Sequence, residues 1–145
     1  MEIRFYAELK SIFNEVKWSA KVDSYQVDVL LTGLKIGIEV DGNYWHKREK
    51  KLKHDIKKGE YLKRKKIKLI RVRENGLDLI NSKLDYNCDH NYQKKETVNK
   101  LLYKIKSITK SEKTIRKINN YLKKSKFVDQ NTFQNISQNL PAPIF

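Results

Sequence analysis

Residues 38–46 gather an unusual number of chemically active side chains at the end of one apolar run. The segment reads Ile-Glu-Val-Asp-Gly-Asn-Tyr-Trp-His, so Glu39 and Asp41 alternate along the run and His46 follows a glycine turn. Acids in such a place need a chemical reason, because a buried carboxylate without a partner is costly. The chain carries 32 Lys and Arg against 17 Asp and Glu. Acids gathered at one point of a polycation suggest a metal site that acts on a polyanion.

Asp28 is a third acid that we expect at the same place. It interrupts the apolar run 25–32, which we interpret as a strand that forms a hairpin with a second strand, 35–41, through a two-residue link. In this hairpin Asp28 lies near the distal end of the second strand, close to Glu39 and Asp41. Like charges raise one another's pKa, and Mg²⁺, which prefers oxygen ligands, removes the conflict. The competing interpretation is that these acids pair with lysines of the following helix.

Three further side chains are candidates for proton transfer or for orienting it. His46 stands five residues after Asp41, where an imidazole can act as a general base or acid. Asp55 lies on the sheet-facing side of a helix expected over residues 47–65, where it could orient His46 or a water. Glu8 flanks the apolar face of a helix that we expect over residues 3–16. For each of them the ordinary interpretation is a surface or structural residue.

An aromatic pair and then a basic helix follow the acids. Consecutive aromatic side chains beside a phosphate-binding surface can stack on bases or wedge between them, although one of the pair can instead cap the core. Residues 47–66 contain eleven Lys or Arg and three acids, and 100–126 contain ten Lys or Arg and one acid. Such helices would follow a phosphate backbone, although lysine runs are often only a solvated face. The DNA-contacting residues that we predict are Tyr44, Trp45, Lys47, Arg48, Lys50 and Lys51.

The elements that must position these residues indicate an α/β fold. A helix over 47–65 between the second strand and a third strand at 67–72 forms a crossover, and crossovers join parallel strands. The core is therefore expected to be a mixed sheet flanked by helices. Further elements expected along the chain are an edge strand at 84–88, a helix at 97–108 and a helix from the N-cap Ser111 to near Lys126. We place a domain at 1–108 and a basic helical extension or linker at 109–145.

Composition limits the partner and the setting. A net charge of +15 and a pI near 9.8 imply a polyanion, with nucleic acid ahead of an anionic membrane surface. No segment resembles a membrane span or a signal peptide. The single cysteine, Cys88, excludes an internal disulfide and a Cys-rich zinc site. We therefore expect a cytoplasmic protein that binds double-stranded DNA and no membrane.

These residues resemble the very short patch repair endonuclease branch of the PD-(D/E)xK nucleases, which includes relatives among phage homing endonucleases. The matching stretches are Val-Asp-Val-Leu at 27–30, the segment 38–46, and 55–74 with its Leu-Ile-Arg-Val-Arg-Glu end. That branch uses an EDxHD arrangement of acid, strand aspartate, backbone carbonyl, histidine and aspartate. The resemblance assigns these roles to Glu8, Asp28, the carbonyl of Val40, His46 and Asp55, with Glu15 as an alternative to Glu8.

The resemblance implies a restriction-endonuclease-like fold and a cofactor, Mg²⁺ or Mn²⁺, held by Asp28, Glu39 and Val40. Three positions depart from the wider pattern. Val27 stands where a proline is expected before the strand aspartate, and Asp41 replaces the superfamily lysine, which moves the proton chemistry to His46. Asn43 stands where the repair enzyme has a cysteine, so no structural zinc is expected and mismatch-specific repair is not supported.

The function that we predict from the sequence is a metal-dependent DNA endonuclease that hydrolyses phosphodiester bonds, of the homing or very-short-patch-repair-like kind. One such site cuts one strand, so a double-strand break would need a homodimer or a second turnover. The alternative is a non-catalytic nucleic-acid-binding module on a nuclease fold. A basic RNA-associated protein with structural acids and an RNA-cleaving enzyme also stay open, because metal-assisted hydrolysis does not identify the sugar.

Overall fold

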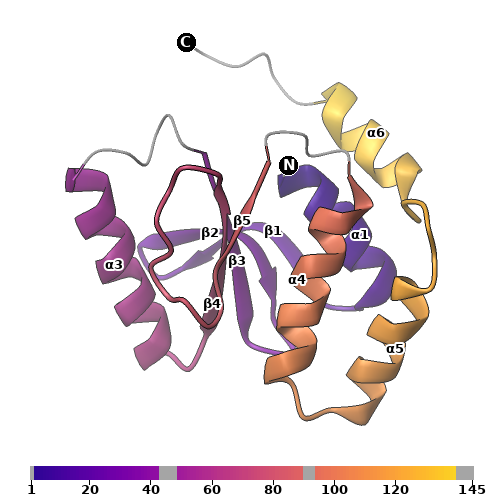
Figure 1. Ribbon diagram of the computed structural model, residues 1–145, viewed down its shortest axis with the longest axis horizontal. Coiled ribbons are helices and arrows are strands. Elements are labelled where there is room, and N and C mark those ends of the chain that lie inside the picture. The colour runs from indigo at the N-terminus through magenta and orange to yellow at the C-terminus, as the bar shows by residue number, and fades with distance from the viewer. Residues whose placement is uncertain (1, 43–48, 90–93, 140–145) are drawn as a thin grey trace.

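The computed structural model describes residues 2–42, 49–89 and 94–139, and in them five helices surround one five-stranded mixed sheet (Figure 1). The helices are α1 (Glu2–Ile12), α3 (Glu49–Arg64), α4 (Lys95–Ile108), α5 (Glu112–Leu122) and α6 (Gln130–Asn139). The strands are β1 (Val16–Val22), β2 (Tyr25–Leu31), β3 (Ile36–Asp41), β4 (Lys68–Glu74) and β5 (Tyr86–Cys88). The predicted α/β class and mixed sheet are confirmed.

The strands lie in the order β1-β2-β3-β4-β5, with β1 to β3 antiparallel and β3 to β5 parallel. The predicted crossover is confirmed, because α3 connects β3 to its parallel neighbour β4. The predicted hairpin of β2 and β3 is confirmed too, but its two-residue link is wrong. Leu31 pairs with Ile36, so residues 32–35 form the link, and Lys35 has a positive φ of 54° there.

Strand β1 is missing from the sequence-based prediction. It occupies residues that follow α1, which ends at Ile12 rather than at residue 16 as expected. Its side chains alternate between exposed and partly buried, and only Ala20 is fully buried. Its apolar residues alternate with polar ones, as is typical of a half-buried strand, and it pairs along its length with β2.

Most of the hydrophobic core lies between one face of the sheet and the helices α1, α4 and α5, on the right of Figure 1. Alternate residues of β3 and β4 face this core, and the helices contribute their own apolar faces. The fully buried side chains of this cluster include Phe5, Leu9, Ile38, Ile70, Leu101, Leu102, Ile105 and Ile118.

Helix α3 covers the opposite face of the sheet through a smaller apolar cluster of Val27, Leu62 and Leu69. Helix α3 approaches the sheet closely at Gly59. A Cβ atom at Gly59 would lie 3.2 Å from Nη2 of Arg71, so a side chain there would press on the guanidinium of this buried β4 residue. A charged group therefore fills part of the space between α3 and the sheet.

The described part of the predicted extension packs into the same core as the rest of the chain. Ser111 caps α5 as predicted, since its Oγ accepts a hydrogen bond from the Thr114 amide at 3.2 Å. Ile118 and Tyr121 of α5 belong to the main hydrophobic cluster, and α6 contacts α1. The edge of the core therefore does not coincide with the boundary expected after residue 108.

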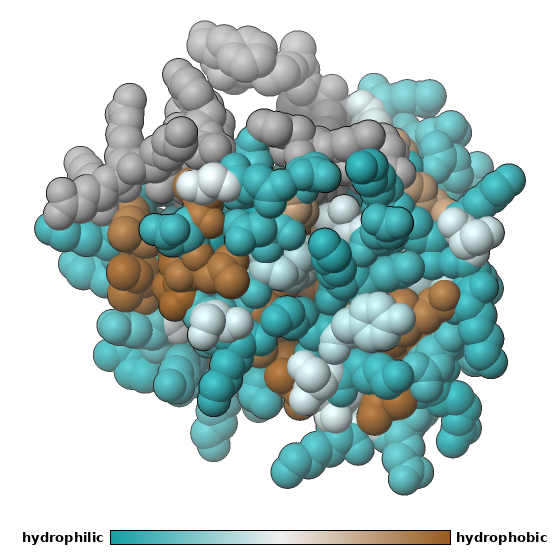
Figure 2. Space-filling view, in the orientation of Figure 1, coloured by the Kyte–Doolittle hydropathy of each residue, from teal (hydrophilic) through white to brown (hydrophobic). Residues whose placement is uncertain are grey.

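The surface is mainly hydrophilic, as Figure 2 shows for one face of the molecule. The exposed large hydrophobic side chains include Leu52 and Ile56 of α3, each 39 % exposed. Among the residues that the structure describes, no helix is both long and apolar enough to cross a membrane.

Candidate active site

Asp28 of β2 and Glu39 of β3 line one cavity of about 340 Å³. The two acids were expected to meet, and the antiparallel pairing of their strands brings them together. Three side chains of α3 complete the basic wall of the cavity. The lining residues are Ser24, Tyr25, Gln26, Asp28, Glu39, Lys51, His54 and Lys58.

The Asp28 carboxylate is held by the neighbouring strand. Its Oδ2 accepts a hydrogen bond from the Val40 amide at 2.8 Å. The backbone pairing of β2 and β3 ends at Val29 and Ile38, so the side chain of Asp28 takes the place of the next backbone partner. The pairing of β2 with β1 also skips Asp28, where it would meet Ser19, which has a positive φ of 52°. Such irregular points in a strand re-aim side chains and occur beside active sites.

The carboxyl group of Glu39 is hard to ionise in the folded protein. Burial raises its pKa to about 8, and the negative charge of Asp28 adds to the increase. Lys58 of α3 acts in the opposite direction, because its Nζ donates a hydrogen bond to Glu39 Oε1. The pair is mostly buried, with both side chains 12 % exposed. The ammonium therefore reduces the cost of the buried carboxylate without removing it.

Glu2 is a third acid at this place, and sequence reasoning missed it. Burial raises the pKa of Glu2 to about 7, and the charge of Asp28 and a hydrogen bond with its side chain raise it further. Glu2, Phe5 and Leu9 are spaced as one face of α1, and Phe5 and Leu9 point into the core. That spacing could have identified Glu2 as the acid of this helix that meets the sheet.

Glu8, the acid expected from the first helix, lies elsewhere, and that prediction is not supported by the geometry. Its side chain is fully buried and does not line the cavity. Its Oε1 accepts hydrogen bonds from the Tyr121 hydroxyl at 2.6 Å and the Val128 amide at 2.7 Å, and its Oε2 accepts one from the Asp129 amide at 2.8 Å. Glu8 therefore anchors the segment between α5 and α6 to α1. Glu15, its alternative, is exposed and accepts a hydrogen bond from Thr32.

Asp41 and Asp55 are both buried, and neither lines the cavity. Asp41 forms an ion pair with Arg73 at 2.9 Å, and the Nε of Arg71 lies 3.9 Å from the same Asp41 oxygen. The parallel register explains this, because Asp41 is the partner of Arg73 in the neighbouring strand. The expected burial of Asp55 toward the sheet is confirmed, and its backbone carbonyl accepts a hydrogen bond from Arg71.

The predicted DNA-contacting segment is described only in part. His46, Tyr44, Trp45, Lys47 and Arg48 lie outside the described residues, and Lys50 is described by its place in α3 alone. Lys51 lines the cavity. The spacing of Lys51, His54 and Lys58 by three and four residues places them on one face of α3, a pattern that could have identified His54 and Lys58 from the sequence.

The cavity thus combines two carboxyl groups, of which Glu39 resists ionisation, with the basic side chains of α3. The His54 ring packs against Tyr25, with the ring centroids 5.9 Å apart. Tyr25 in turn packs against Tyr61, with the ring centroids 5.0 Å apart. Within residues 2–42, 49–89 and 94–139, no three His, Cys, Asp or Glu side chains are arranged so that they could hold a metal ion. The acids that share the site are the pairs Asp28–Glu39 and Asp28–Glu2.

Comparison with known proteins adds no assignment to this site. The chain matches no protein-family model, no curated protein sequence and no solved structure.

Proposed function

We propose that the protein is a metal-dependent endonuclease that hydrolyses phosphodiester bonds of double-stranded DNA inside the cell. The observation that carries the proposal is the meeting of Asp28 and Glu39 at one cavity, with Glu2 hydrogen-bonded to Asp28, in a chain with a net charge of +15. Burial and the charge of Asp28 raise the pKa of Glu39 and of Glu2, and a bound cation would stabilise their ionised forms. Lysines on the same cavity favour a phosphate substrate.

The oxygen-rich donor set fits Mg²⁺ or Mn²⁺. Asp28 and Glu39 would hold the ion, and the resemblance to PD-(D/E)xK nucleases adds the Val40 carbonyl. A divalent ion at such a site supplies polarisation of the phosphate. Lys58 and Lys51 provide positive charge at the same cavity, where they can contact phosphate oxygens. A restriction-endonuclease-like fold belongs to this proposal, supported by the mixed sheet and its crossover.

Two histidines are proposed for proton transfer. His54 lines the cavity with both carboxylates, and His46 is the residue that the resemblance assigns to this role. An imidazole is suited to accept a proton from water or to give one to a leaving oxygen near neutral pH. Asp55 and the aromatic pair Tyr44 and Trp45 keep the roles predicted from the sequence, orienting the histidine and contacting DNA. One cavity would cut one strand, so a double-strand break would need a homodimer or a second turnover.

A non-catalytic nucleic-acid-binding module is the second candidate function. Two observations on the described residues favour it. No three metal-binding side chains come together, and the Glu39 carboxylate already accepts a hydrogen bond from the Lys58 ammonium. In such a module the carboxylates would be structural and the lysines would bind phosphates without cleavage.

Plasmid nicking separates the two candidates. Supercoiled DNA is incubated with the wild-type protein, with Asp28→Asn, and with Asp78→Asn, which removes one negative charge at an exposed position outside the cavity. The enzyme proposal predicts nicking that requires Mg²⁺ or Mn²⁺, a loss of about a hundredfold or more in Asp28→Asn, and wild-type rates in Asp78→Asn. Equal nicking by all three proteins would assign the activity to a contaminant. DNA binding without any nicking would support the second candidate.

A further inference from the structure

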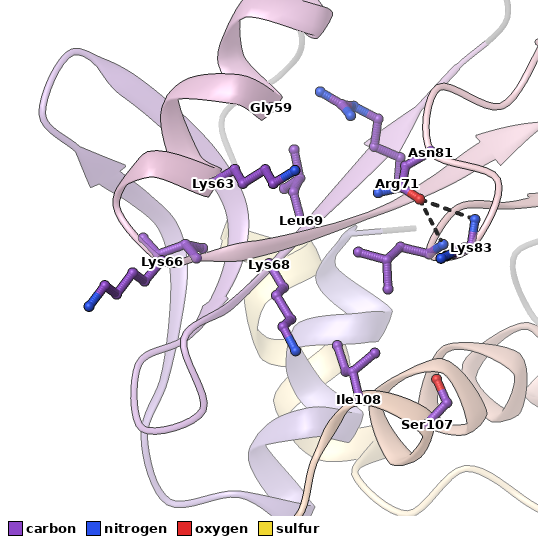
Figure 3. Close-up of a pocket in the computed structure, with 12 residues that line it drawn as sticks. Gly59, Lys63, Lys66, Lys68, Leu69, Arg71, Asn81, Lys83, Ser107 and Ile108 are labelled. Atoms are coloured by element: carbon purple, nitrogen blue, oxygen red, sulfur yellow. Dashed lines mark hydrogen bonds between the residues drawn. The ribbon is translucent and has the colours of Figure 1, made fainter.

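Another cavity of the molecule, larger than that of Asp28 and Glu39, is lined by basic side chains. It has a volume of about 630 Å³ and lies between α3, β4, the loop before β5 and the end of α4 (Figure 3). It exists because β5 pairs only with residues 72–74 of β4, which leaves the first half of β4 without a neighbouring strand on that side. Four lysines line it, namely Lys63, Lys66, Lys68 and Lys83, together with the buried Arg71.

A second cavity of about 250 Å³ adjoins the first and extends the basic surface. The two cavities share Lys66, Lys68 and Ile108, and the second adds Lys35 and Lys110. We call the two together the lysine groove, defined by Lys35, Lys63, Lys66, Lys68, Lys83 and Lys110. Among the described residues, neither cavity is lined by an Asp or Glu side chain. The groove shares no lining residue with the cavity of Asp28 and Glu39.

Two of these lysines occupy backbone positions that favour glycine. Lys66 ends α3 with φ 62°, and the bonds Lys66 N–H to Lys63 O and Ile67 N–H to Leu62 O, both 2.9 Å, form a Schellman motif. Lys35 has φ 54° in the β2–β3 link, and its carbonyl accepts a hydrogen bond from the Lys68 amide at 3.0 Å. A side chain is disfavoured in this left-handed region, so the backbone alone would select glycine at both positions. The chain keeps a positive charge there instead.

The ammonium groups of the groove are available to a ligand. All six lysines that define the groove are exposed, and none of them forms an ion pair with an acid in the described part of the chain. Lysine ammonium groups bind phosphates as point charges. None of the described residues that line the groove is aromatic, so it offers charge to a phosphate backbone rather than stacking to bases.

We propose that the lysine groove binds a nucleic-acid strand through its phosphates, at a place separate from the cavity where cleavage is proposed. The concave shape over two joined cavities fits a strand better than a single phosphorylated molecule or a flat membrane. The inference rests on the proposed function only in taking nucleic acid as the polyanion. It needs neither the metal nor catalysis, so binding is measured in EDTA and the result is independent of the nicking assay.

The test uses the double variant Lys35→Gly and Lys66→Gly. It removes two positive charges from the groove and places glycine at two backbone positions with positive φ. Its control, Lys17→Gln with Lys123→Gln, removes two exposed charges outside the groove. Fluorescence anisotropy with a labelled 20-nucleotide single strand measures affinity as a function of salt. The slope of log K against log[salt] is negative, and each lost phosphate contact reduces its magnitude by about 0.7. We expect a decrease of about 1.4 in the groove variant and a much smaller one in the control.

Thermal unfolding shows that weaker binding is not a folding defect. The groove variant should melt a few degrees higher than the wild type, because glycine suits both backbone positions. Equal binding by the groove variant and the control would overturn the proposal. It would also be overturned if a mononucleotide competed as well as the strand, or if the groove variant lost binding to phosphatidylserine vesicles while keeping its affinity for the strand.

Discussion

Replacement of Glu39 by glutamine tests the electrostatics of the proposed site without any substrate. The pKa of Glu39 rises from an ordinary 4.5 to about 8 in the folded protein, first through burial and then through Asp28. Below pH 4.5 both the folded and the unfolded chain hold the proton, so the group has no effect on stability. Between pH 4.5 and about 8 only the unfolded chain releases it, and the free energy of unfolding therefore decreases as the pH rises.

The size of the effect follows from the pKa. Each unit corresponds to 1.36 kcal/mol, so the ionised carboxylate costs the folded protein at most about 5 kcal/mol above pH 8. Glutamine has nearly the same shape and does not ionise. Glu39→Gln should therefore match the wild type near pH 4 and become progressively more stable than it up to pH 8 or 9.

Denaturant unfolding between pH 4 and pH 9 measures this difference, with Asp78→Asn as the control for the loss of one exposed acid. If the free energies of unfolding of the wild type and Glu39→Gln changed with pH in parallel, the raised pKa of Glu39 would be contradicted. Saturating Mg²⁺ should stabilise the wild type more than Glu39→Gln, since ligand that binds only the folded state adds RT ln(1 + [L]/Kd). A destabilised site that a cation relieves is the stability–activity compromise expected of an active site.

Two further variants test the structural assignments outside the cavity. Glu8→Gln places an amide group among the donors from Tyr121, Val128 and Asp129, so it should lower stability by about 2–4 kcal/mol and speed hydrogen exchange of the last two amides, with nicking per folded molecule unchanged. Wild-type stability with lost nicking would instead return Glu8 to the catalytic set. Ile118→Ala should cost about 2–5 kcal/mol within a single unfolding transition, because Ile118 is part of the main core. A separate low-temperature transition would show that α5 folds independently.

The central part of the fold could be predicted because its signals are local. The apolar runs of β2, β3 and β4 and the uninterrupted helical stretch between them fix a hairpin and a crossover, and the handedness and direction of the crossover leave one arrangement. The meeting of Asp28 and Glu39 follows from the hairpin alone. Strand β1 was missed although its apolar and polar residues alternate, because Val16 also continues the helical spacing of Phe5, Leu9, Ile12 and Phe13.

The partners of the acids required the three-dimensional register. Helical periodicity shows which face of α1 is buried but not which turn of the helix reaches Asp28. The sequence therefore predicts Glu8 as the acid beside Asp28, whereas the structure places Glu2 there. The ion pair of Asp41 with Arg73 depends on how β4 aligns with β3, which no pattern within either strand reveals. The groove depends on a short β5 and on two lysines with positive φ, neither of which the composition of a lysine-rich segment indicates.

A metal-dependent nuclease site at Asp28 and Glu39 is tested by the rate at which supercoiled plasmid is nicked as Mg²⁺ or Mn²⁺ is titrated. The wild type and Asp28→Asn are compared at equal DNA occupancy. We expect a wild-type rate that rises from zero with the divalent ion and saturates, and no divalent-dependent rate in Asp28→Asn. Nicking by Asp28→Asn at the wild-type rate, or wild-type DNA binding without nicking at any ion concentration, would contradict this expectation.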